Sequence, residues 1–309
     1  IVPFTTSISD ANTLQEKFRE TADKTKIPIT QLGESVGPAA GEFRLFALET
    51  EKSQAALVGF QAQMKSMGGG SGALIAESIM TEGSISSAEQ SINMFKALSV
   101  QMKDLGVMPQ VLSENYNKLI GTFGMFGDSA TINIARTSLA ATKAKVDVGA
   151  ITGFGENFSG YSQAASTAQQ INAIFGRRII DNPAELVSIF YTGGGEAALE
   201  YVKRKLVTSG VNLEEMLGGA AGAARLRMLG GMGFGDAKSA RRALLGDTTI
   251  SAGEQSSLVD AMEKGKTGEG KDELTTRFDD IAREMLTQAV RVQQMNEEVT
   301  ADFFSSLGV

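Results

Sequence analysis

The chain has 309 residues and a formal net charge of −7, and it contains no histidine and no cysteine. These two absences exclude Ser-His-Asp and Cys-His catalysis, Cys/His zinc sites, haem ligation by His or Cys, iron–sulfur clusters and disulfides. Any chemistry would have to use carboxylate, Lys, Tyr, Ser or Thr side chains, or oxygen-bound Mg²⁺ or Ca²⁺. The acidic balance argues against nucleic acid as the main partner.

The composition favours helices packed closely together. Hydrophobic residues make up 42% of the chain, aromatic residues only 6%, and there are 13 Met and no Trp. Sheets favour aromatic and β-branched residues, whereas Ala, Leu and Met suit helix packing. No segment reaches the roughly 18–20 apolar residues of a membrane span. The start, Ile1-Val2-Pro3-Phe4, has no initiator Met and is not an intact signal peptide, so we expect a longer or processed parent protein.

The first part of the chain predicts two helices. One runs from about residue 10 to residue 24, with Thr13 and Glu16 at capping-box spacing. Pro28 and Gly37-Pro38 then interrupt the pattern. A long helix is expected over 39–67, where apolar residues recur at steps of three and four. The glycine-rich run 68–72 predicts a flexible hinge after it.

The middle of the chain predicts many shorter helices separated by glycine. The expected helices lie at 73–81, 84–105, from Pro109 onwards with a loop at 121–127, 128–145, 161–175, 182–190, 196–208, 213–217, 222–229, 236–245 and 253–264. Short helices bury little surface alone, so those between 149 and 250 should form one compact domain. The polar, glycine-rich stretch 265–270 predicts a flexible linker.

The C-terminal element, expected over 272–304, gives a clear amphipathic signal. Its apolar residues repeat every four and three residues, which is typical of a coiled-coil seam with one polar layer at Gln288. The predicted oligomer seam is Leu274, Phe278, Ile281, Met285, Gln288, Val292, Met295 and Val299. The alternative is that this stripe packs on the helices of residues 84–145 as ordinary core.

The sequence therefore predicts an all-α, multi-helix, glycine-punctuated fold that ends in an amphipathic, coiled-coil-like helix. We expect five consecutive segments: N-terminal helices at 1–68, a helical domain at 73–148, a compact small-helix domain at 149–250, a helix and flexible linker at 251–270, and a C-terminal oligomerisation helix at 271–309.

The sequence contains only incomplete patterns for ligand-binding sites. Gly265-Lys266-Thr267 has the ending of a phosphate-binding loop, but Asp260 stands where the pattern needs glycine and no strand precedes it. Glycine turns at 193–195 and 230–235 could cradle anions at helix starts, although helix termination and close packing explain them better. Adjacent carboxylates on a helix point about 100° apart and are poor acid/base pairs, which applies to Glu214-Glu215, Asp279-Asp280 and Glu297-Glu298.

Basic residues gather between positions 203 and 242, interspersed with acidic ones, which favours a solvated helix face. They are Lys203, Arg204, Lys205, Arg225, Arg227, Lys238, Arg241 and Arg242. If they form a binding patch, an acidic protein neighbour is favoured over DNA. We expect no enzymatic activity, no cofactor, no bound metal and no small-molecule substrate.

The glycine-punctuated helical run 164–246 resembles a stretch of the tape measure proteins of tailed bacteriophages. The resemblance rests on Ala168–Gly176, which ends in Asn-Ala-Ile-Phe-Gly, on Ala197–Gly210 followed by Asn212-Leu213-Glu214-Glu215-Met216, on the small-residue helix Ala220–Leu229, and on Leu245-Gly246-Asp247. A typical tape measure protein also has a very long central helix, whereas the sequence predicts none beyond about 30 residues in this chain.

The resemblance implies a non-enzymatic virion protein that sets tail length and lies in the tail lumen or baseplate hub after assembly in the host cytoplasm. Its implied partners are further copies of itself, tail tube proteins and baseplate hub proteins. A trimer would suit a tail hub, although the seam does not fix the number of copies. The alternatives are another internal virion or baseplate protein, or a secreted helical effector that acts at membranes.

Overall fold

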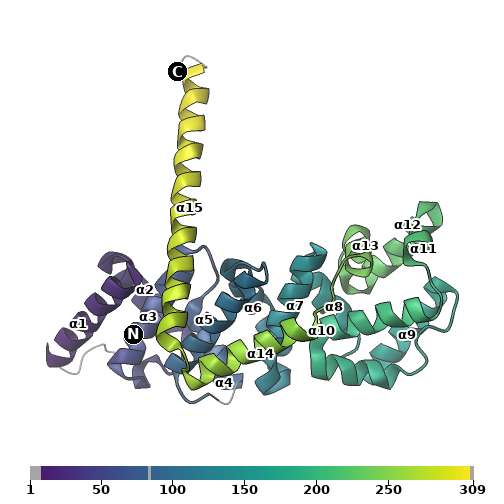
Figure 1. Ribbon diagram of the computed structural model, residues 1–309, viewed down its shortest axis with the longest axis horizontal. Helices are drawn as coiled ribbons and strands as arrows, with labels where there is room; N and C mark the ends of the chain where they lie inside the picture. Colours follow the sequence, from purple (N-terminus) through teal and green to yellow (C-terminus); the bar gives the residue numbers. More distant parts are fainter. Residues whose placement is uncertain (1–7, 83–84, 307–309) are drawn as a thin grey trace. The chain divides into compact units, whose positions relative to one another are not determined.

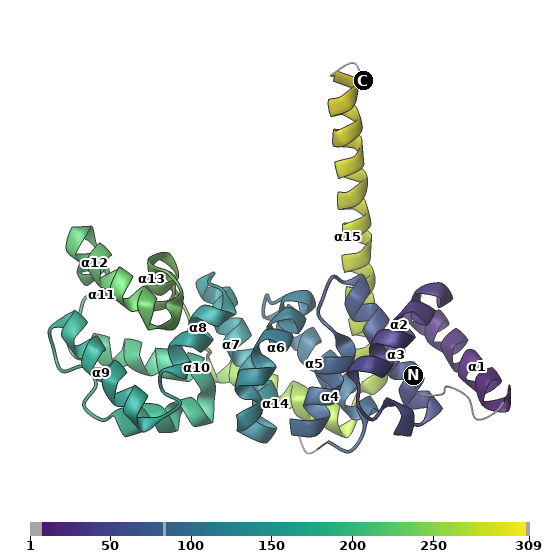
Figure 2. The same ribbon diagram turned by 180° about the vertical axis from the view of Figure 1, so that it is seen from behind.

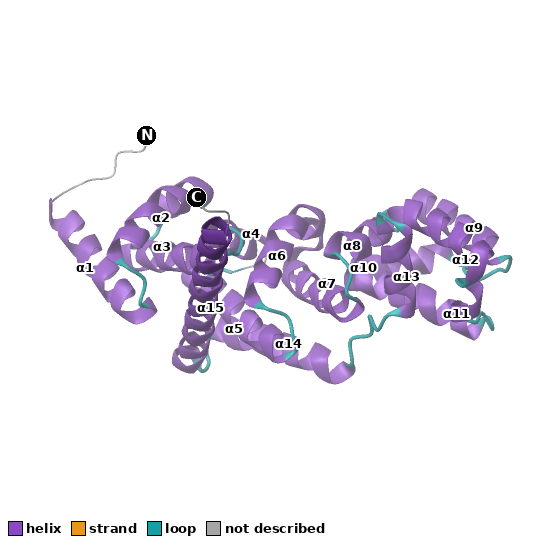
Figure 3. Ribbon diagram, turned by 90° about the horizontal axis from the view of Figure 1, so that it is seen from above, coloured by secondary structure: helices purple, strands orange, loops and turns teal. Residues whose placement is uncertain are grey.

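The computed structural model describes residues 8–82 and 85–306, and every regular element in these ranges is helical (Figure 3). Fifteen α-helices and three short helical turns make up this described part, with no strand among them. The all-α fold predicted from the sequence is confirmed.

The chain forms two compact units. The first comprises Ile1–Met80, Ile85–Val100 and Met262–Val309, and the second comprises Thr81–Ser84 and Gln101–Ala261. This division differs from the five consecutive segments expected from the sequence. The C-terminal segment shares a unit with the N-terminal helices, and the expected segments 73–148 and 251–270 are each divided between the units. The reason is packing between residues that lie far apart in the sequence.

The first unit is built around one buried helix, α3. Its elements are α1 (Ile8–Thr25), α2 (Ile29–Glu42), η1 (Phe46–Leu48), α3 (Glu51–Ser66), α4 (Gly72–Glu82) up to Met80, α5 (Ala88–Asp104) up to Val100, the end of α14 (Ala252–Thr267) and α15 (Lys271–Ser306). Helices α1, α2 and α15 all contact α3, which is buried on nearly every side between Ala55 and Met64. Burial on most of its sides makes α3 the central helix of this unit. In Figures 1 and 2, the C-terminal half of α15 extends away from the other helices of this unit.

The single long helix expected over 39–67 is wrong, because the structure divides this stretch between α2, η1 and α3. The Thr50 hydroxyl accepts a hydrogen bond from the Ser53 amide, which caps the start of α3. The Gln54 amide group donates to the carbonyl oxygens of Phe46 and Glu49, which holds the chain just before α3 in a non-helical path. The heptad-like spacing therefore reflects two separate helices that share one core.

The two glycine-rich runs expected to be flexible form a helix-ending turn and the end of a helix in the structure. Gly68 has a φ of 71°, and the Gly69 amide donates to the carbonyl of Met64 at 2.9 Å, so this run is a helix-ending turn. The linker expected at 265–270 is partly helical instead, because α14 continues to Thr267. A Cβ at Gly265 would lie 2.5 Å from the Cα of Met94, so glycine permits close packing of α14 on α5.

The second unit consists of shorter helices. Its elements are the end of α5, α6 (Pro109–Phe123), η2 (Gly124–Ser129), α7 (Ala130–Ala144), α8 (Val148–Glu156), α9 (Tyr161–Phe175), α10 (Pro183–Thr208), α11 (Leu213–Met216), α12 (Gly219–Leu229), η3 (Gly230–Phe234), α13 (Ala237–Leu245) and the start of α14 up to Ala261. Helix α10 contacts α7, α8 and α9, so it is central to this unit.

One boundary in the second unit differs from the sequence expectation. The loop expected at 121–127 is the end of α6 followed by the tight turn η2, and α7 begins at Ala130. The turn expected at 193–195 is present as a kink within α10, where Gly194 has the non-helical φ and ψ of 73° and −167°. Helix α9 also ends at Phe175 before a left-handed Gly176, as the sequence predicts.

Candidate interaction surface on the C-terminal helix

Helix α15 starts after a sharp turn made by two glycines. Gly268 and Gly270 have φ values of 75° and 66°, which few other residues adopt without strain. Asp272 and Glu273 occupy the first turn of the helix, where negative charge is favourable at the positive end of the helix dipole.

The first turns of α15 are anchored in the core of their own unit. Phe278 is fully buried, and its ring centroid lies 6.3 Å from that of Phe60 on α3. The ammonium group of Lys96 on α5 lies 5.2 Å from the centroid of the Phe278 ring. Ile281 and Ala282 are each 7% exposed. Burying a Phe and an Ile side chain stabilises this attachment by about 1.5–3 kcal/mol each.

A buried polar cluster lies beside Phe278. The Gln63 side-chain amide donates to Oδ1 of Asp279 at 2.6 Å, and Nζ of Lys96 lies 3.7 Å from the same oxygen. Burial lowers the pKa of Lys96 below its usual value, and the Asp279 carboxylate opposes that shift. Since both side chains are buried from water, each charged group is stabilised mainly by the opposite charge of the other.

A second ion-pair group secures the start of α15. Lys271 donates a hydrogen bond to Glu89 on α5, and Nζ of Lys52 on α3 lies 3.3 Å from the same carboxylate. These two lysines hold the pKa of Glu89 below its usual value, chiefly through the Lys271 hydrogen bond. The carboxylate thus connects α3, α5 and α15.

A hollow of about 440 Å³ lies against this cluster, lined by α1, α3, α5 and the start of α15. Its charged lining consists of Lys17, Lys24, Lys52, Lys96, Lys271, Glu20, Glu89, Asp272 and Asp279. Several of these side chains pair with each other, so the hollow presents no single sign of charge to a ligand. The Oε1 atom of Gln63 is buried without a hydrogen-bond partner among the described residues.

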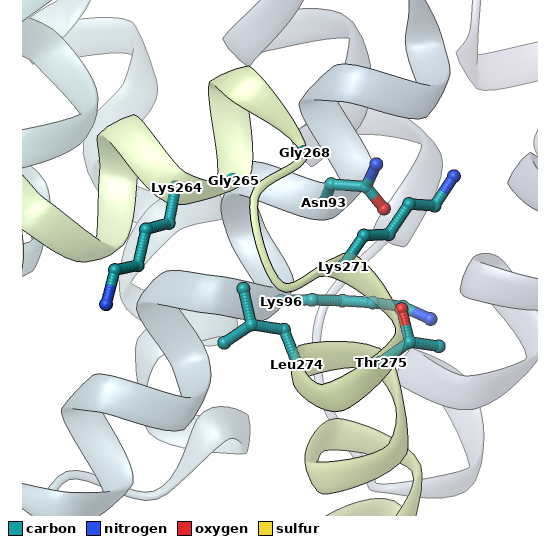
Figure 4. A pocket seen from close by; sticks show the side chains of 8 residues that line it. All are labelled: Asn93, Lys96, Lys264, Gly265, Gly268, Lys271, Leu274 and Thr275. Carbon is teal, nitrogen blue, oxygen red and sulfur yellow. The ribbon is translucent and has the colours of Figure 1, made fainter.

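A much smaller hollow of about 10 Å³ lies where α14 turns into α15 (Figure 4). Its volume suits about one water molecule. Figure 4 shows Lys264 and Lys271 pointing to opposite sides of it, with Lys96 passing below Lys271 toward Thr275. This arrangement is a packing defect at a turn, and it offers no room for a substrate.

Beyond Arg283 the apolar side chains of α15 lose their cover. Met285 is half-buried, whereas Val292 is 56% exposed and Met295 is 63% exposed. Leu286 and Val290 are also exposed, at 39% and 46%, but at 3.6 residues per turn they lie on the opposite side of the helix from Val292 and Met295. Exposed large apolar side chains that share one face of a helix are typical of interaction surfaces.

The predicted seam is therefore divided. Phe278 and Ile281 are core residues of the unit, and Leu274 is half-buried beside them. Met285, Gln288, Val292 and Met295 form the part that can meet another molecule, and the side chain of Val299 lies outside the described residues. We call Met285, Gln288, Val292 and Met295 the distal seam. The expectation that the whole stripe faces a partner is corrected by the burial of its first third.

The other glycine features of the sequence serve packing. Gly265-Lys266-Thr267 are the last residues of α14, and the Thr267 hydroxyl donates to the carbonyl of Glu263 at 2.9 Å. A Cβ at Gly195 would lie 2.7 Å from the carbonyl oxygen of Ile151, and one at Gly233 would lie 2.2 Å from that of Gly153. These glycines allow backbones to approach closely, and none of them forms a strand-to-helix phosphate loop.

Several basic side chains between 203 and 242 bind the protein's own backbone. Lys203 donates to the carbonyl of Gly246, Arg225 donates to the carbonyls of Ile174 and Met216, and Arg242 donates to the carbonyl of Lys145. These bonds satisfy carbonyl groups near helix ends. These three basic residues therefore have a structural role within their unit.

The second unit contains a buried ion pair that the sequence analysis missed. Nη2 of Arg136 on α7 donates to Oε2 of Glu196 on α10 at 2.9 Å, and Glu196 is 3% exposed. Burial raises the pKa of Glu196 to about 7, although Arg136 acts in the opposite direction. A lone arginine within the small, apolar residues of α7 is the signal that could have indicated a buried acidic partner.

Neither a metal site nor a membrane span is found in the described part of the chain. Its acidic side chains form no group of three that could hold a metal ion. None of its helices is both long enough and apolar enough to cross a bilayer. No protein-family model, curated protein or solved structure matches the chain.

Proposed function

We propose that this protein is a non-enzymatic structural component that assembles with copies of itself through the distal seam of α15. The observation that carries the proposal is the exposure of Val292 and Met295 on a helix whose first turns are fixed in the protein core. Fixed attachment presents the distal seam to a partner in one orientation.

The distal seam has the features of a self-pairing helix. Its residues continue the four-and-three spacing that lets helices interlock side by side. Full burial of Val292 and Met295 would contribute about 1.5–3 kcal/mol each. The exposed Gln288 amide can hydrogen-bond across such a contact, and a polar layer of this kind favours one register over others.

We further propose that the assembly is a phage tail, in which this chain forms part of a tape measure protein that sets tail length. The support is the resemblance of residues 164–246 to that family, together with the helical, His- and Cys-free composition. The protein would lie in the tail lumen or baseplate hub. Its partners there would be its own copies, the tail tube and the baseplate hub proteins.

Self-association is tested by Val292→Asp and by Val292→Asp combined with Met295→Asp. We expect light scattering to show monomers for these variants and an oligomer for the parent chain, with equal helicity by circular dichroism. Ile281 is unsuitable for this test because it is buried in the unit. The matched control is Val207→Asp on α10, which also replaces an exposed valine, at 63% exposure, and should leave the oligomer intact.

The place of assembly is tested separately. Antibody against the chain should label purified phage particles, and a variant lacking the distal seam should reduce the number of complete tails. Labelling without a change in tail length would support another internal virion or baseplate protein. Binding of the purified chain to liposomes, with no association with particles, would support the membrane-active effector instead.

A further inference from the structure

The hollow of about 440 Å³ in the first unit is large enough for a small organic molecule, since ligand pockets span about 300–1,000 Å³. Its walls come from four helices of that unit, α1, α3, α5 and α15. Apolar lining is supplied by Ala55, Ala56 and Phe60 on α3 and by Ile92 on α5. The polar groups of α3, α5 and α15 indicate which kind of molecule fits.

Ammonium groups outnumber carboxylates where α3, α5 and α15 meet at the hollow. Three lysines there share two carboxylates, namely Lys52, Lys96 and Lys271 with Glu89 and Asp279. The lining as a whole also has one more lysine than carboxylates, five against four. Burial is the main cause of the lowered pKa of Lys96, and repulsion from the Lys271 charge adds to it. An anion between these two ammonium groups would relieve the repulsion and balance the excess positive charge.

Two neutral side chains that can donate hydrogen bonds lie beside the same lysines. Asn93 and Thr275 line both this hollow and the smaller one in Figure 4, as do Lys96 and Lys271. Ammonium, amide and hydroxyl groups are the donors from which a carboxylate accepts. This wall therefore suits a carboxylate.

One buried acceptor at the hollow needs a donor. Gln63 is 1% exposed, and its side-chain nitrogen donates to the Asp279 carboxylate, which when ionised can only accept. The orientation of the amide is therefore fixed, and Oε1 has no hydrogen-bond partner among the described residues. An O–H or N–H group on a ligand would satisfy this atom. An ammonium group would cancel the charge of the ligand's own carboxylate, so a hydroxyl suits the positive excess better.

We infer that the hollow binds a small hydroxycarboxylic acid with an apolar body. Its carboxylate accepts from Lys96 and Lys271, and its hydroxyl donates to Oε1 of Gln63. Its apolar part lies against Phe60 and Ile92. This ligand role goes beyond the assembly role proposed above and does not depend on it. Because the ligand touches both α15 and the helices that hold it, binding stabilises the attachment of α15.

Mandelate is a suitable probe, because it combines a carboxylate, a neighbouring hydroxyl and a phenyl ring. Calorimetric titration of the full chain should show one mandelate bound per chain. Phenylacetate lacks the hydroxyl and should bind about three- to tenfold more weakly, as expected for one hydrogen bond. Lactate lacks the ring and should also bind more weakly. Mandelate should slow hydrogen exchange in α3, α5 and the start of α15, and leave α7 and α10 unchanged.

A pair of lysine variants tests where the carboxylate lies. Lys271→Met removes one of the two ammonium groups and should weaken mandelate binding about tenfold. The matched control is Lys264→Met. Lys264 is exposed, does not line the larger hollow, and points to the opposite side of the smaller one in Figure 4. This control should leave the dissociation constant unchanged.

Each part of the inference has a result that would overturn it. Equal affinity for mandelate and phenylacetate would show that Gln63 does not accept from the ligand. Equal affinity of the two lysine variants for mandelate would show that the carboxylate lies elsewhere. If neither mandelate nor lactate binds or slows exchange, no ligand of this class occupies the hollow, and the inference is wrong while the assembly role stands.

Discussion

The contact between Lys96 and Asp279 gives a quantitative test of how α15 is attached. Asp279→Asn keeps the shape of the side chain and can still accept from Gln63, but it removes the negative charge. Lys96, which is 8% exposed, is then left without a counter-charge. Removing one partner of a buried pair costs about 3–5 kcal/mol. We expect about 3 kcal/mol, the low end, because Nζ and Oδ1 are 3.7 Å apart.

The neighbouring residue supplies a matched control. Asp280 carries the same charge on the same helix, but its side chain is 60% exposed and pairs with Arg283 at 3.0 Å. Asp280→Asn should therefore cost less than about 0.5 kcal/mol. The two variants have the same net charge, so a difference between their free energies of unfolding is due to the burial of the Asp279 pair.

Native-state hydrogen exchange by mass spectrometry is the appropriate assay. The chain has two units, so a single unfolding transition is not assured. Peptides from α3, α5 and the start of α15 report on the first unit, and peptides from α7 and α10 report on the second. Asp279→Asn should lower the opening free energy in the first set alone.

The pH dependence of the same measurement has a definite sign. Burial lowers the pKa of Lys96 in the folded protein, so the unfolded chain binds more protons as pH approaches the usual value of 10.5. Stability from this group therefore rises with pH. Without the opposing Asp279 carboxylate the downward shift of the Lys96 pKa is larger, so the stability deficit of Asp279→Asn should shrink as the pH rises toward the usual value of 10.5. Equal losses in both variants, or a deficit unaffected by pH, would refute the buried-pair reasoning.

Two further predictions concern the second unit. Burial raises the pKa of Glu196 to about 7, so the folded protein holds this proton more tightly than the unfolded chain does. The free energy of unfolding should therefore fall as the pH rises from about 5 to about 7. Glu196→Gln should remove this pH dependence, measured by hydrogen exchange of α10. Gly194→Ala should destabilise the unit by about 1–3 kcal/mol, because φ is 73° and the new Cβ would lie 2.9 Å from Phe123. The control is Gly253→Ala at the exposed start of α14, where a new Cβ would meet no other atom. Chemical denaturation of both variants should show that Gly253→Ala is neutral or stabilising.

The elements that the sequence predicted well are those whose signals are local. Helix α9 ends at Phe175 because the following glycine adopts a left-handed conformation. Helix α13 begins after Asp236, whose carboxylate accepts from the amide of Ser239 at 2.6 Å. Capping residues and glycines act within one turn, so a single sequence reveals them.

The errors lie where long-range packing determines the conformation. The break between α2 and α3 contains neither proline nor glycine, and it depends on the Gln54 amide reaching the carbonyls of Phe46 and Glu49. Gly265 reads as part of a flexible run, but its lack of a side chain lets α14 lie against the backbone of Met94. Neither contact leaves a pattern in the linear sequence.

The candidate site shows the same limit. The spacing from Leu274 to Val299 correctly predicted one continuous amphipathic helix, which α15 confirms. Periodicity identifies an apolar face but not the surface that covers it. Phe278 and Val292 occupy equivalent positions in the repeat, yet Phe278 is fully buried and Val292 is 56% exposed. Their exposure differs because α3 and α5 cover Phe278 and do not cover Val292.

The division of α15 into a buried base and an exposed end bears on how strongly a second copy could bind. A helix joined through a flexible linker would lose backbone and orientational freedom on association, and that loss would offset much of the gain from burying Val292 and Met295. Here Phe278 and the Asp279 cluster restrict the direction of the helix before any partner arrives. The same contacts make the body of each copy follow the orientation of its helix. A pairing of two such helices would therefore fix the placement of the attached first units, which is what a structural assembly requires and a flexible tether could not provide.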